Sequence, residues 1–262
     1  MNEIRIGVSG CCGRMGRAVV RLAAEDAALR VAAGVTVAGD PLLGQDVGTI
    51  AGVKALGVAV AEKPGATPDV CVDFSTPAAC ARWAAWCAER GVALVSGTTG
   101  LGEAEQAALR NAAGRVAVVW AANMSVGVNL LLGLVEQAAR ALDAGWDVEI
   151  VEAHHRNKAD APSGTARALL GSVNAGRGEE AALKHGRHGA HELRNAGEIG
   201  VHAVRMGGVV GDHDVHFASS GEVLTLSHRA GSRDIFAAGA LRAAKWIVGK
   251  PAGLYSMQDV LK

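Results

Sequence analysis

The segment from Arg5 to Ala23 limits the possible folds of this chain more than any other part of the sequence. A short apolar run over residues 5–9 leads directly into the glycine-rich loop Gly10-Cys11-Cys12-Gly13-Arg14-Met15-Gly16. Apolar residues then recur at helical spacing as far as Ala23. A strand, a glycine loop and an amphipathic helix in this order are typical of dinucleotide-binding folds, whose loop holds the phosphates. The spacing is G-x-x-G-x-x-G, not the commoner G-x-G-x-x-G, and the alternative is an ordinary tight turn.

Strands alternate with helices over the first half of the chain. The pattern predicts further strands at 31–37, 70–74, 93–96 and 115–120. It predicts helices at 103–113 and from a cap at Ser75 or Thr76 to about Arg90, with Trp83 and Trp86 in the core. This alternation predicts an α/β fold, a Rossmann-like parallel sheet. Residues 126–142 are so apolar that we expect a helix buried between two layers.

The pattern changes after residue 146. Strands are predicted in succession at 147–154, 199–206, 213–219 and 222–228, with one helix after Ser163. Residues 236–248 return to helical periodicity and are expected to pack on the first domain. We therefore predict a dinucleotide-binding domain of residues 1–125 plus 235–262, with an inserted α+β mixed-sheet domain of residues 126–234 for substrate binding and oligomerisation. The polar block 186–198 is predicted to be a mobile loop, and its histidines, with His185, are not expected to bind a metal.

The segment from Glu152 to Ala166 carries most of the groups suited to chemistry. It holds His154, His155, Arg156 and Lys158 between a predicted strand and a helix capped by Ser163. A helix N-terminus presents backbone N–H groups and a partial positive charge, which suits a carboxylate or phosphate. The segment therefore indicates a site for an anionic small molecule beside a proton donor. The alternative is a basic, solvated surface loop.

Composition excludes several classes of protein. Lysine plus arginine equals aspartate plus glutamate, 26 each, so the chain lacks the basic field of a general nucleic-acid binder. Five cysteines without metal-like spacing predict a reduced, cytoplasmic protein. No leader or 18-residue apolar run is seen, so we expect no membrane partner.

The motifs together resemble the 4-hydroxy-tetrahydrodipicolinate reductase family, also called dihydrodipicolinate reductases, of bacterial lysine biosynthesis through diaminopimelate. The resemblance covers nearly the whole chain, and its most specific part is the run from His154 to Ala166. The other segments that carry it are Gly10–Gly16, Gly97-Thr98-Thr99-Gly100, Asn123–Asn129 and Val210-Gly211-Asp212-His213.

The resemblance implies NAD(P)H-dependent reduction of a cyclic imine dicarboxylate, with loss of water, by a homotetramer. It implies that His154 is an acid/base and Lys158 the proton donor, and that His155, Ser163, Gly164 and Thr165 meet the substrate carboxylates. The residues implied to line NADPH or NADH are Gly10, Cys11, Cys12, Gly13, Arg14, Met15, Gly97, Thr98, Thr99, Ala121, Ala122, Asn123 and Met124. Two other readings stay open: a related dehydrogenase for another small imine or aldehyde, and a nicotinamide-sensing regulator without turnover.

The chain differs from the family at two positions that distinguish NADH from NADPH. Thr36 stands where many members carry an acid, and Val37 where some carry an arginine. Asp40 is the next acid, but Gly39 leaves its direction open. We therefore expect NADPH and NADH to be used within about tenfold of each other, with NADPH slightly ahead. At the glycine loop, we expect Cys11 and Cys12 to be two small, inert side chains that fill a tight turn. The alternative is that the helix N-terminus lowers a thiol pKa, so that modification of either cysteine blocks the cofactor.

Overall fold

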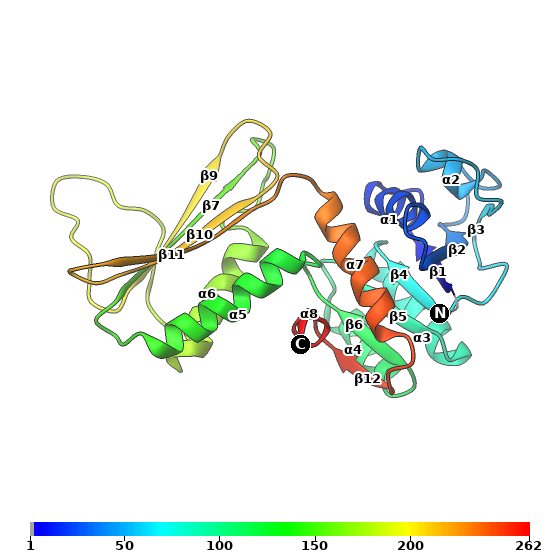
Figure 1. The fold of residues 1–262 in the computed structure, drawn as a ribbon. Coiled ribbons are helices and arrows are strands. Elements are labelled where there is room, and N and C mark those ends of the chain that lie inside the picture. The colour runs from blue at the N-terminus through cyan, green and yellow to red at the C-terminus, as the bar shows by residue number, and fades with distance from the viewer. Residues whose placement is uncertain (1–2) are drawn as a thin grey trace. The chain divides into compact units, whose positions relative to one another are not determined.

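The computed structural model describes residues 3–262, which form two compact units (Figure 1). The first unit runs to Val126 and resumes over Asp234–Lys262, and the second comprises Gly127–Arg233. The second unit is thus inserted between two segments of the first. Among the described residues, no helix is long and apolar enough to cross a membrane.

A seven-stranded sheet forms the centre of the first unit. All its strand pairs are parallel, in the order β12-β6-β5-β4-β1-β2-β3. Its central strands are short apolar runs buried on both faces, as parallel sheets require. The strands are β1 (Ile4–Ser9), β2 (Leu29–Val35), β3 (Val60–Ala61), β4 (Val70–Asp73), β5 (Ala93–Ser96), β6 (Ala117–Trp120) and β12 (Gly253–Tyr255).

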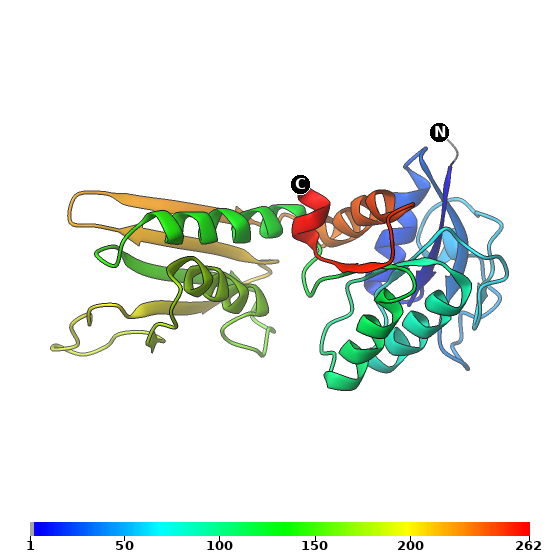
Figure 2. The ribbon, with the colours of Figure 1, turned by 90° about the horizontal axis from the view of Figure 1, so that it is seen from below.

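Helices cover both faces of this sheet (Figures 1 and 2). One core joins the sheet to α1 (Arg14–Ala24), α7 (Asp234–Ile247) and α8 (Met257–Leu261), and includes Val47 of the short α2 (Val47–Ile50). A second core lies under α3 (Pro77–Arg90) and α4 (Glu103–Ala113). The Rossmann-like prediction is confirmed, and α7 packs on the first unit as expected.

Several predicted boundaries differ from the structure. The predicted strand 31–37 is β2, which ends at Val35, so Thr36 and Val37 lie beyond it. Thr76, not Ser75, caps α3: its hydroxyl accepts from the Ala79 backbone N–H, with a proline at the first position. The elements that were not predicted from the sequence are short: α2, β3, β8 (Leu183–Lys184), β12 and α8.

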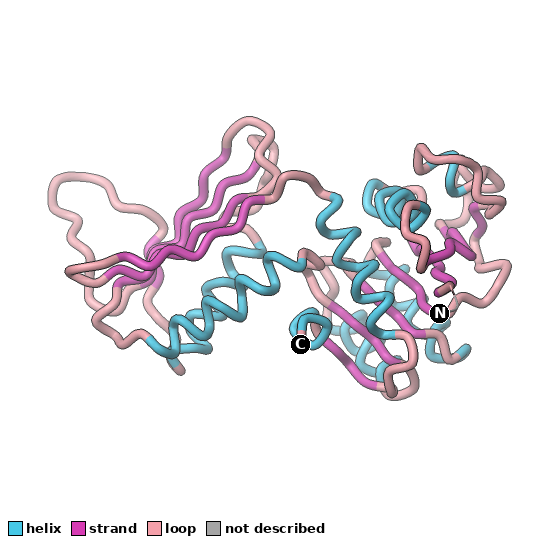
Figure 3. Tube along the Cα trace, in the orientation of Figure 1, coloured by secondary structure: helices cyan, strands magenta, loops and turns pink. Residues whose placement is uncertain are grey.

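The second unit is a five-stranded mixed sheet with two helices on one face (Figures 1 and 3). The order is β11-β10-β7-β9-β8, with β10 antiparallel to both neighbours and the other pairs parallel. Its strands are β7 (Asp147–His154), β8 (Leu183–Lys184), β9 (Ile199–Arg205), β10 (Asp212–Ala218) and β11 (Val223–Arg229). Leucines and valines of α5 (Val126–Ala141) and α6 (Gly164–Arg177) pack on its inner face.

Helix α5 is not buried between two layers, and that prediction was wrong. Leu130 is 55% exposed and Leu134 42% exposed. Helix α5 contributes Leu131, Val135 and Ala139 to the core, so only the side facing the sheet is covered. The apolar side chains on its other side therefore stay accessible.

The polar block after β8 is a loop, as predicted, and ion pairs connect it to the sheet. Arg187 and Arg194 both pair with Glu149 of β7. Glu149 also accepts from His202 of β9, at 2.6 Å. In residues 3–262, no three His, Cys, Asp or Glu side chains gather as a metal site.

Candidate functional site

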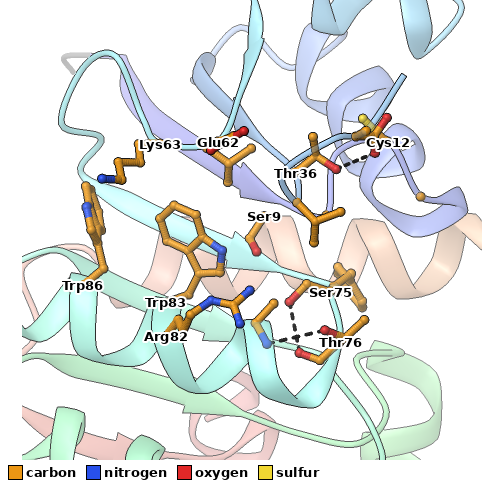
Figure 4. Close-up of a pocket in the computed structure, with 17 residues that line it drawn as sticks. Ser9, Cys12, Thr36, Glu62, Lys63, Ser75, Thr76, Arg82, Trp83 and Trp86 are labelled. Atoms are coloured by element: carbon orange, nitrogen blue, oxygen red, sulfur yellow. Dashed lines mark hydrogen bonds between the residues drawn. The ribbon is translucent and has the colours of Figure 1, made fainter. Parts of the chain in front are cut away.

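A cavity of about 560 Å³ opens at the carboxyl ends of β1, β2 and β4 in the first unit (Figure 4). Ligands bind at this edge in open α/β folds, and a cavity of this size is typical of a cofactor or drug-sized ligand. Its lining residues are Ser9, Gly10, Cys12, Gly13, Val35, Thr36, Val37, Asp40, Glu62, Lys63, Phe74, Ser75, Thr76, Ala79, Arg82, Trp83 and Trp86.

The glycine loop brings backbone close to the cavity. Gly10 has φ +73°, and a Cβ there would lie 2.6 Å from the Phe74 carbonyl oxygen. A Cβ at Gly16 would lie 2.1 Å from the Gly10 carbonyl oxygen, so α1 packs directly on the loop. Gly13 lines the cavity and is the N-cap of α1. A helix start beside an open glycine backbone fits a dinucleotide pyrophosphate.

The thiols of the two cysteines in this loop are not activated, as we expected. Cys11 is fully buried, and burial raises its thiol pKa to about 12. Cys12 is half-buried in the cavity wall, and burial raises its pKa as well. The cost of desolvating a thiolate exceeds any gain from the helix N-terminus. The alternative of a reactive thiol is therefore contradicted, whereas Cys12 does line the cavity.

The far wall of the cavity is formed by α3 (Figure 4). Trp83 and Trp86, predicted to be core residues, both line the cavity and meet edge to face with ring centroids 5.4 Å apart. Arg82 lies beside them and is exposed. The spacing i, i+3 placed both tryptophans on one face of the helix, but the sequence did not show that this face borders a cavity.

The other predicted cofactor residues do not line this cavity. The segment Gly97–Thr99 follows β5, and Ala121–Met124 follows β6, so both loops leave the same edge of the sheet as the cavity. Buried Asp73, at the end of β4, accepts from Thr98 Oγ1 at 2.7 Å and Ser96 Oγ at 3.1 Å. These bonds fix the start of the Gly-Thr-Thr-Gly loop. Cys11, Arg14 and Met15 belong to the glycine loop but lie outside the cavity wall.

In the second unit, His154 ends β7 next to a buried carboxylate. Its Nδ1 lies 2.6 Å from Oε2 of Glu152, which is fully buried. Both carboxylate oxygens also accept from Arg205 of β9, at 2.8 and 2.9 Å. Burial raises the pKa of Glu152, but hydrogen bonds from Arg205 and His154 outweigh it and leave the pKa lowered. Glu152 is therefore ionised at neutral pH and fixes the orientation of the His154 ring.

Arg205 also organises the loop that carries Lys158. Its guanidinium donates to the carbonyl oxygens of Lys158 and Asp160, at 3.2 and 2.5 Å. Lys158 Nζ donates to Asp160 Oδ1 at 2.7 Å, and that hydrogen bond holds the pKa of Asp160 below its usual value. The ammonium group is thus paired with an exposed carboxylate, in reach of solvent and of a ligand.

Ser163 begins α6 and connects it to β10. Its Oγ accepts from the Ala166 backbone N–H at 3.1 Å and lies 3.2 Å from Nε2 of His213. His213 is buried, and burial together with the nearby His154 ring, at 5.2 Å, lowers its pKa to about 4. A Cβ at Gly211 would lie 3.0 Å from His154 Nε2, so a glycine leaves this nitrogen accessible.

The structure thus brings together most of the predicted substrate residues. His154, Lys158 and Ser163 share the network around Glu152 and Arg205, and Gly164 and Thr165 form the first turn of α6. His155 is half-buried, and its carbonyl accepts from the Lys158 N–H. Arg205 was missed because no local pattern relates it to Glu152, 53 positions away.

Known proteins similar to this one match nearly the whole chain. The family models described as dihydrodipicolinate reductase, N-terminus and C-terminus, match residues 4–124 and 127–261. The 4-hydroxy-tetrahydrodipicolinate reductase of Anaeromyxobacter dehalogenans is 49% identical over 98% of this chain and 97% of its own. That of Rubrobacter xylanophilus is 49% identical over 98% of each chain. A solved structure, dipicolinate-bound dihydrodipicolinate reductase from Paenisporosarcina sp. TG-14, superposes with a TM-score of 0.77 at 24% identity, covering 97% of this chain and 98% of that one.

Proposed function

The chain belongs to the dihydrodipicolinate reductase family, and from this premise we propose that it reduces 4-hydroxy-tetrahydrodipicolinate to tetrahydrodipicolinate. The reaction consumes one hydride from NADPH or NADH and one proton, and it releases one water. It belongs to the diaminopimelate route to lysine. The observation that carries the proposal is the match of both family models together with the ordered set Glu152, His154, Lys158 and Arg205.

We assign the cofactor to the cavity of the first unit. Gly10, Cys12 and Gly13 line it, and the start of α1 supplies the positive end of a helix dipole to the pyrophosphate. When bound, the nicotinamide supplies the hydride. The loops Gly97–Thr99 and Ala121–Met124, with Cys11, Arg14 and Met15, are proposed to support the same ligand from the same edge of the sheet.

Lys158 is proposed to give the proton that the reduced product gains. An ammonium group can donate a proton and neutralise negative charge that develops as the hydride arrives. His154 is proposed to act beside it as an acid/base, because Glu152 holds its ring through Nδ1 and leaves Nε2 accessible. In this scheme Glu152 and Arg205 are positioning residues, since they act through His154 and through the loop of Lys158.

The substrate carboxylates are assigned to the start of α6. Gly164 and Thr165 form its first turn, where the helix dipole favours an anion, and His155 adds a donor. Ser163 is proposed to contribute by capping, because its buried hydroxyl is bonded within the protein. The solved relative from Paenisporosarcina binds dipicolinate, which has the same pair of carboxylates.

We further propose a cytoplasmic homotetramer that assembles through the second unit. Helices α5 and α6 cover one face of its sheet (Figure 1). The edge strand β11 exposes Val223 by 63% and Leu224 by 40%. Exposed apolar edge strands are uncommon in monomers because they can pair or pack with other chains. Sedimentation velocity should give four times the 26.7 kDa chain mass; a concentration-independent monomer contradicts this.

The function is tested by turnover. Purified protein should oxidise NADPH or NADH only when the cyclic substrate is present, with product identified by mass spectrometry. Oxidation with aspartate semialdehyde but not with the cyclic substrate would favour a related dehydrogenase. Cofactor binding without turnover of either substrate would favour a nicotinamide-sensing regulator.

A further inference from the structure

The cavity contains a carboxylate at the place where dinucleotide-binding folds usually carry one, but it comes from another position in the sequence. In such folds an acid at the end of the second strand accepts hydrogen bonds from the ribose hydroxyls. Here Thr36 follows β2, and its hydroxyl donates to Asp40 Oδ2 at 2.6 Å. Both residues line the cavity together with Gly10 and Gly13 of the phosphate loop. Asp40 therefore places a carboxylate next to Thr36, the first residue after β2.

The Asp40 carboxylate is held in place. Gly39 has φ +76° and turns the chain back, and the Asp40 N–H donates to the Val37 carbonyl at 3.3 Å. Oδ1 of Asp40 accepts from the Leu42 N–H at 2.9 Å, while Oδ2 accepts from Thr36. The Thr36 and Leu42 hydrogen bonds lower the pKa of Asp40, so it is ionised at neutral pH. A carboxylate has about four acceptor positions, so it can also accept from a ribose hydroxyl.

We propose that Asp40 selects NADH over NADPH by accepting a hydrogen bond from the adenosine 2′-hydroxyl and repelling a 2′-phosphate. The inference rests on the proposed function, because it takes the ligand of this cavity to be a nicotinamide dinucleotide. It deepens that function by naming the residue that distinguishes the two cofactors. A carboxylate fixed by two donors meets the hydroxyl without reorganising, and two anions in contact disfavour the phosphate.

Three cations near the cavity oppose this selection. Lys63 and Arg82 line it, and Arg17 acts on Asp40 from the start of α1. All three are exposed, and Arg17 Nε already donates to the Cys12 carbonyl at 2.9 Å. Exposed, flexible charges are screened by water and salt, whereas two hydrogen bonds fix the Asp40 carboxylate in the cavity wall. The balance therefore favours NADH, in contrast to the near-equal use that Thr36 and Val37 suggested from sequence.

The test measures binding without substrate. Trp83 and Trp86 line the cavity, so quenching of tryptophan fluorescence reports the dissociation constants of NADH and NADPH. We expect NADH to bind at least about tenfold more tightly than NADPH. In competition, 5′-AMP should displace NADH more effectively than adenosine 2′,5′-bisphosphate, because the two fragments differ only in the 2′-phosphate.

Variants assign the preference to one carboxylate. Asp40→Asn keeps the size and removes the charge, and it should reduce the NADH preference at least about tenfold, to near equality. Thr36→Val removes a donor that holds Asp40 without altering the carboxylate, and it should reduce the preference by a smaller factor. Glu25→Gln, an exposed carboxylate at the end of α1 and outside the cavity, controls for net charge and should keep the parent ratio.

Two results would overturn the inference: a parent protein that binds NADPH more tightly, or an unchanged ratio in folded Asp40→Asn. A shift caused by Glu62→Gln and not by Asp40→Asn would assign the selection to Glu62, the other carboxylate of the cavity wall. A failure of the proposed reductase function would be seen in turnover and not in cofactor binding. Protein that binds NADH selectively but does not turn over the cyclic substrate would contradict the reductase assignment and leave the role of Asp40 intact.

Discussion

Lys158 is the residue whose removal should affect the chemistry most directly. We expect Lys158→Ala to lower kcat by about 10²- to 10⁴-fold, the usual contribution of a positioned proton donor. The Kd of NADH should hardly change, because the cofactor cavity lies in the first unit. Steady-state rates and fluorescence titration measure the two quantities.

The ion partner of Lys158 offers a matched control. Asp160→Asn removes the carboxylate that accepts from Nζ but leaves the ammonium group. Its kcat should stay within about tenfold of the parent value, since exposed ion pairs contribute little. Equal losses in both variants, or a kcat for Lys158→Ala within tenfold of the parent, would remove the proton-donor role.

His213 makes the stability of the protein depend on pH. Its pKa is about 4 in the folded chain, because of burial and the neighbouring His154, and about 6.5 in an unfolded chain. Below pH 6.5 this histidine binds a proton in the unfolded state, but in the folded state it binds one only below about pH 4. The free energy of unfolding therefore decreases as the pH falls from about 6.5 to about 4. Between pH 7 and pH 5 this amounts to about 2 kcal/mol.

Urea unfolding of His213→Gln should therefore show a smaller loss of unfolding free energy from pH 7 to pH 5 than the parent. Glutamine can still donate to Ser163 Oγ. His216→Gln, on the same strand but on the outer face of the sheet, should keep the parent's pH dependence. Parallel pH profiles for the parent and His213→Gln would contradict the burial argument.

Among single residues, those that lie close together in the sequence could be identified before the structure was known. His154, Lys158 and Ser163 lie in one segment of fifteen residues, so their proximity was predictable. Arg205 and His213 join the same network only through the pairing of β9 and β10 with β7. Asp40 required the turn at Gly39, and its direction depends on hydrogen bonds that the sequence does not reveal.

The N-terminus of α6 is the element on which dicarboxylate binding should depend. Pyridine-2,6-dicarboxylate is expected to compete with the substrate, since it carries the same two carboxylates. Ser163→Ala removes the hydroxyl that accepts from the Ala166 N–H. It should cost about 1 kcal/mol of unfolding free energy and raise the inhibition constant, because the first turn loses its cap.

Ser172→Ala is the matched control, because Ser172 lies in the interior of the same helix. Alanine is the better helix former there, so neither stability nor inhibition should weaken. Noncompetitive inhibition by the dicarboxylate in the parent, or an unchanged inhibition constant in Ser163→Ala, would place carboxylate binding elsewhere.

Long elements with a clear periodicity were predictable, and short ones were not. The helices α3 and α4 and the strand β5 were predicted at nearly their observed bounds, because apolar spacing marks them and Thr76 and Pro77 mark the start of α3. The four residues of α2 depend on Asp46, which accepts from the Gly48 and Thr49 N–H groups and also from Leu56 and Val58. Such contacts between loops leave no periodic pattern in the sequence.

On the scale of the whole molecule, the two units have separate hydrophobic cores. Those of the first unit contain no buried residue from 127–233, and that of the second contains only residues from this range. The order of predicted strands and helices indicated that the second domain is inserted into the first. The alternation of strands and helices stops before residue 146, and a helix that fits the first domain follows near residue 236. A change from one type of sheet to another is visible in the sequence, because each type has its own spacing of apolar residues.

Because the cores are separate, we expect a cofactor fragment to stabilise the first unit and a dicarboxylate to stabilise the second. A ligand at 100 times its Kd stabilises the segment that binds it by about 2.7 kcal/mol, and local opening is suppressed accordingly. Hydrogen exchange with 5′-AMP should therefore slow in peptides around Gly10–Gly16, β2 and α3. Exchange with pyridine-2,6-dicarboxylate should slow around β7 and the start of α6. Each ligand then serves as the control for the other, at equal multiples of its own Kd. Protection of β7 and α6 by 5′-AMP alone would contradict this division, because a ligand of the first unit would then stabilise a core that shares no buried residue with it.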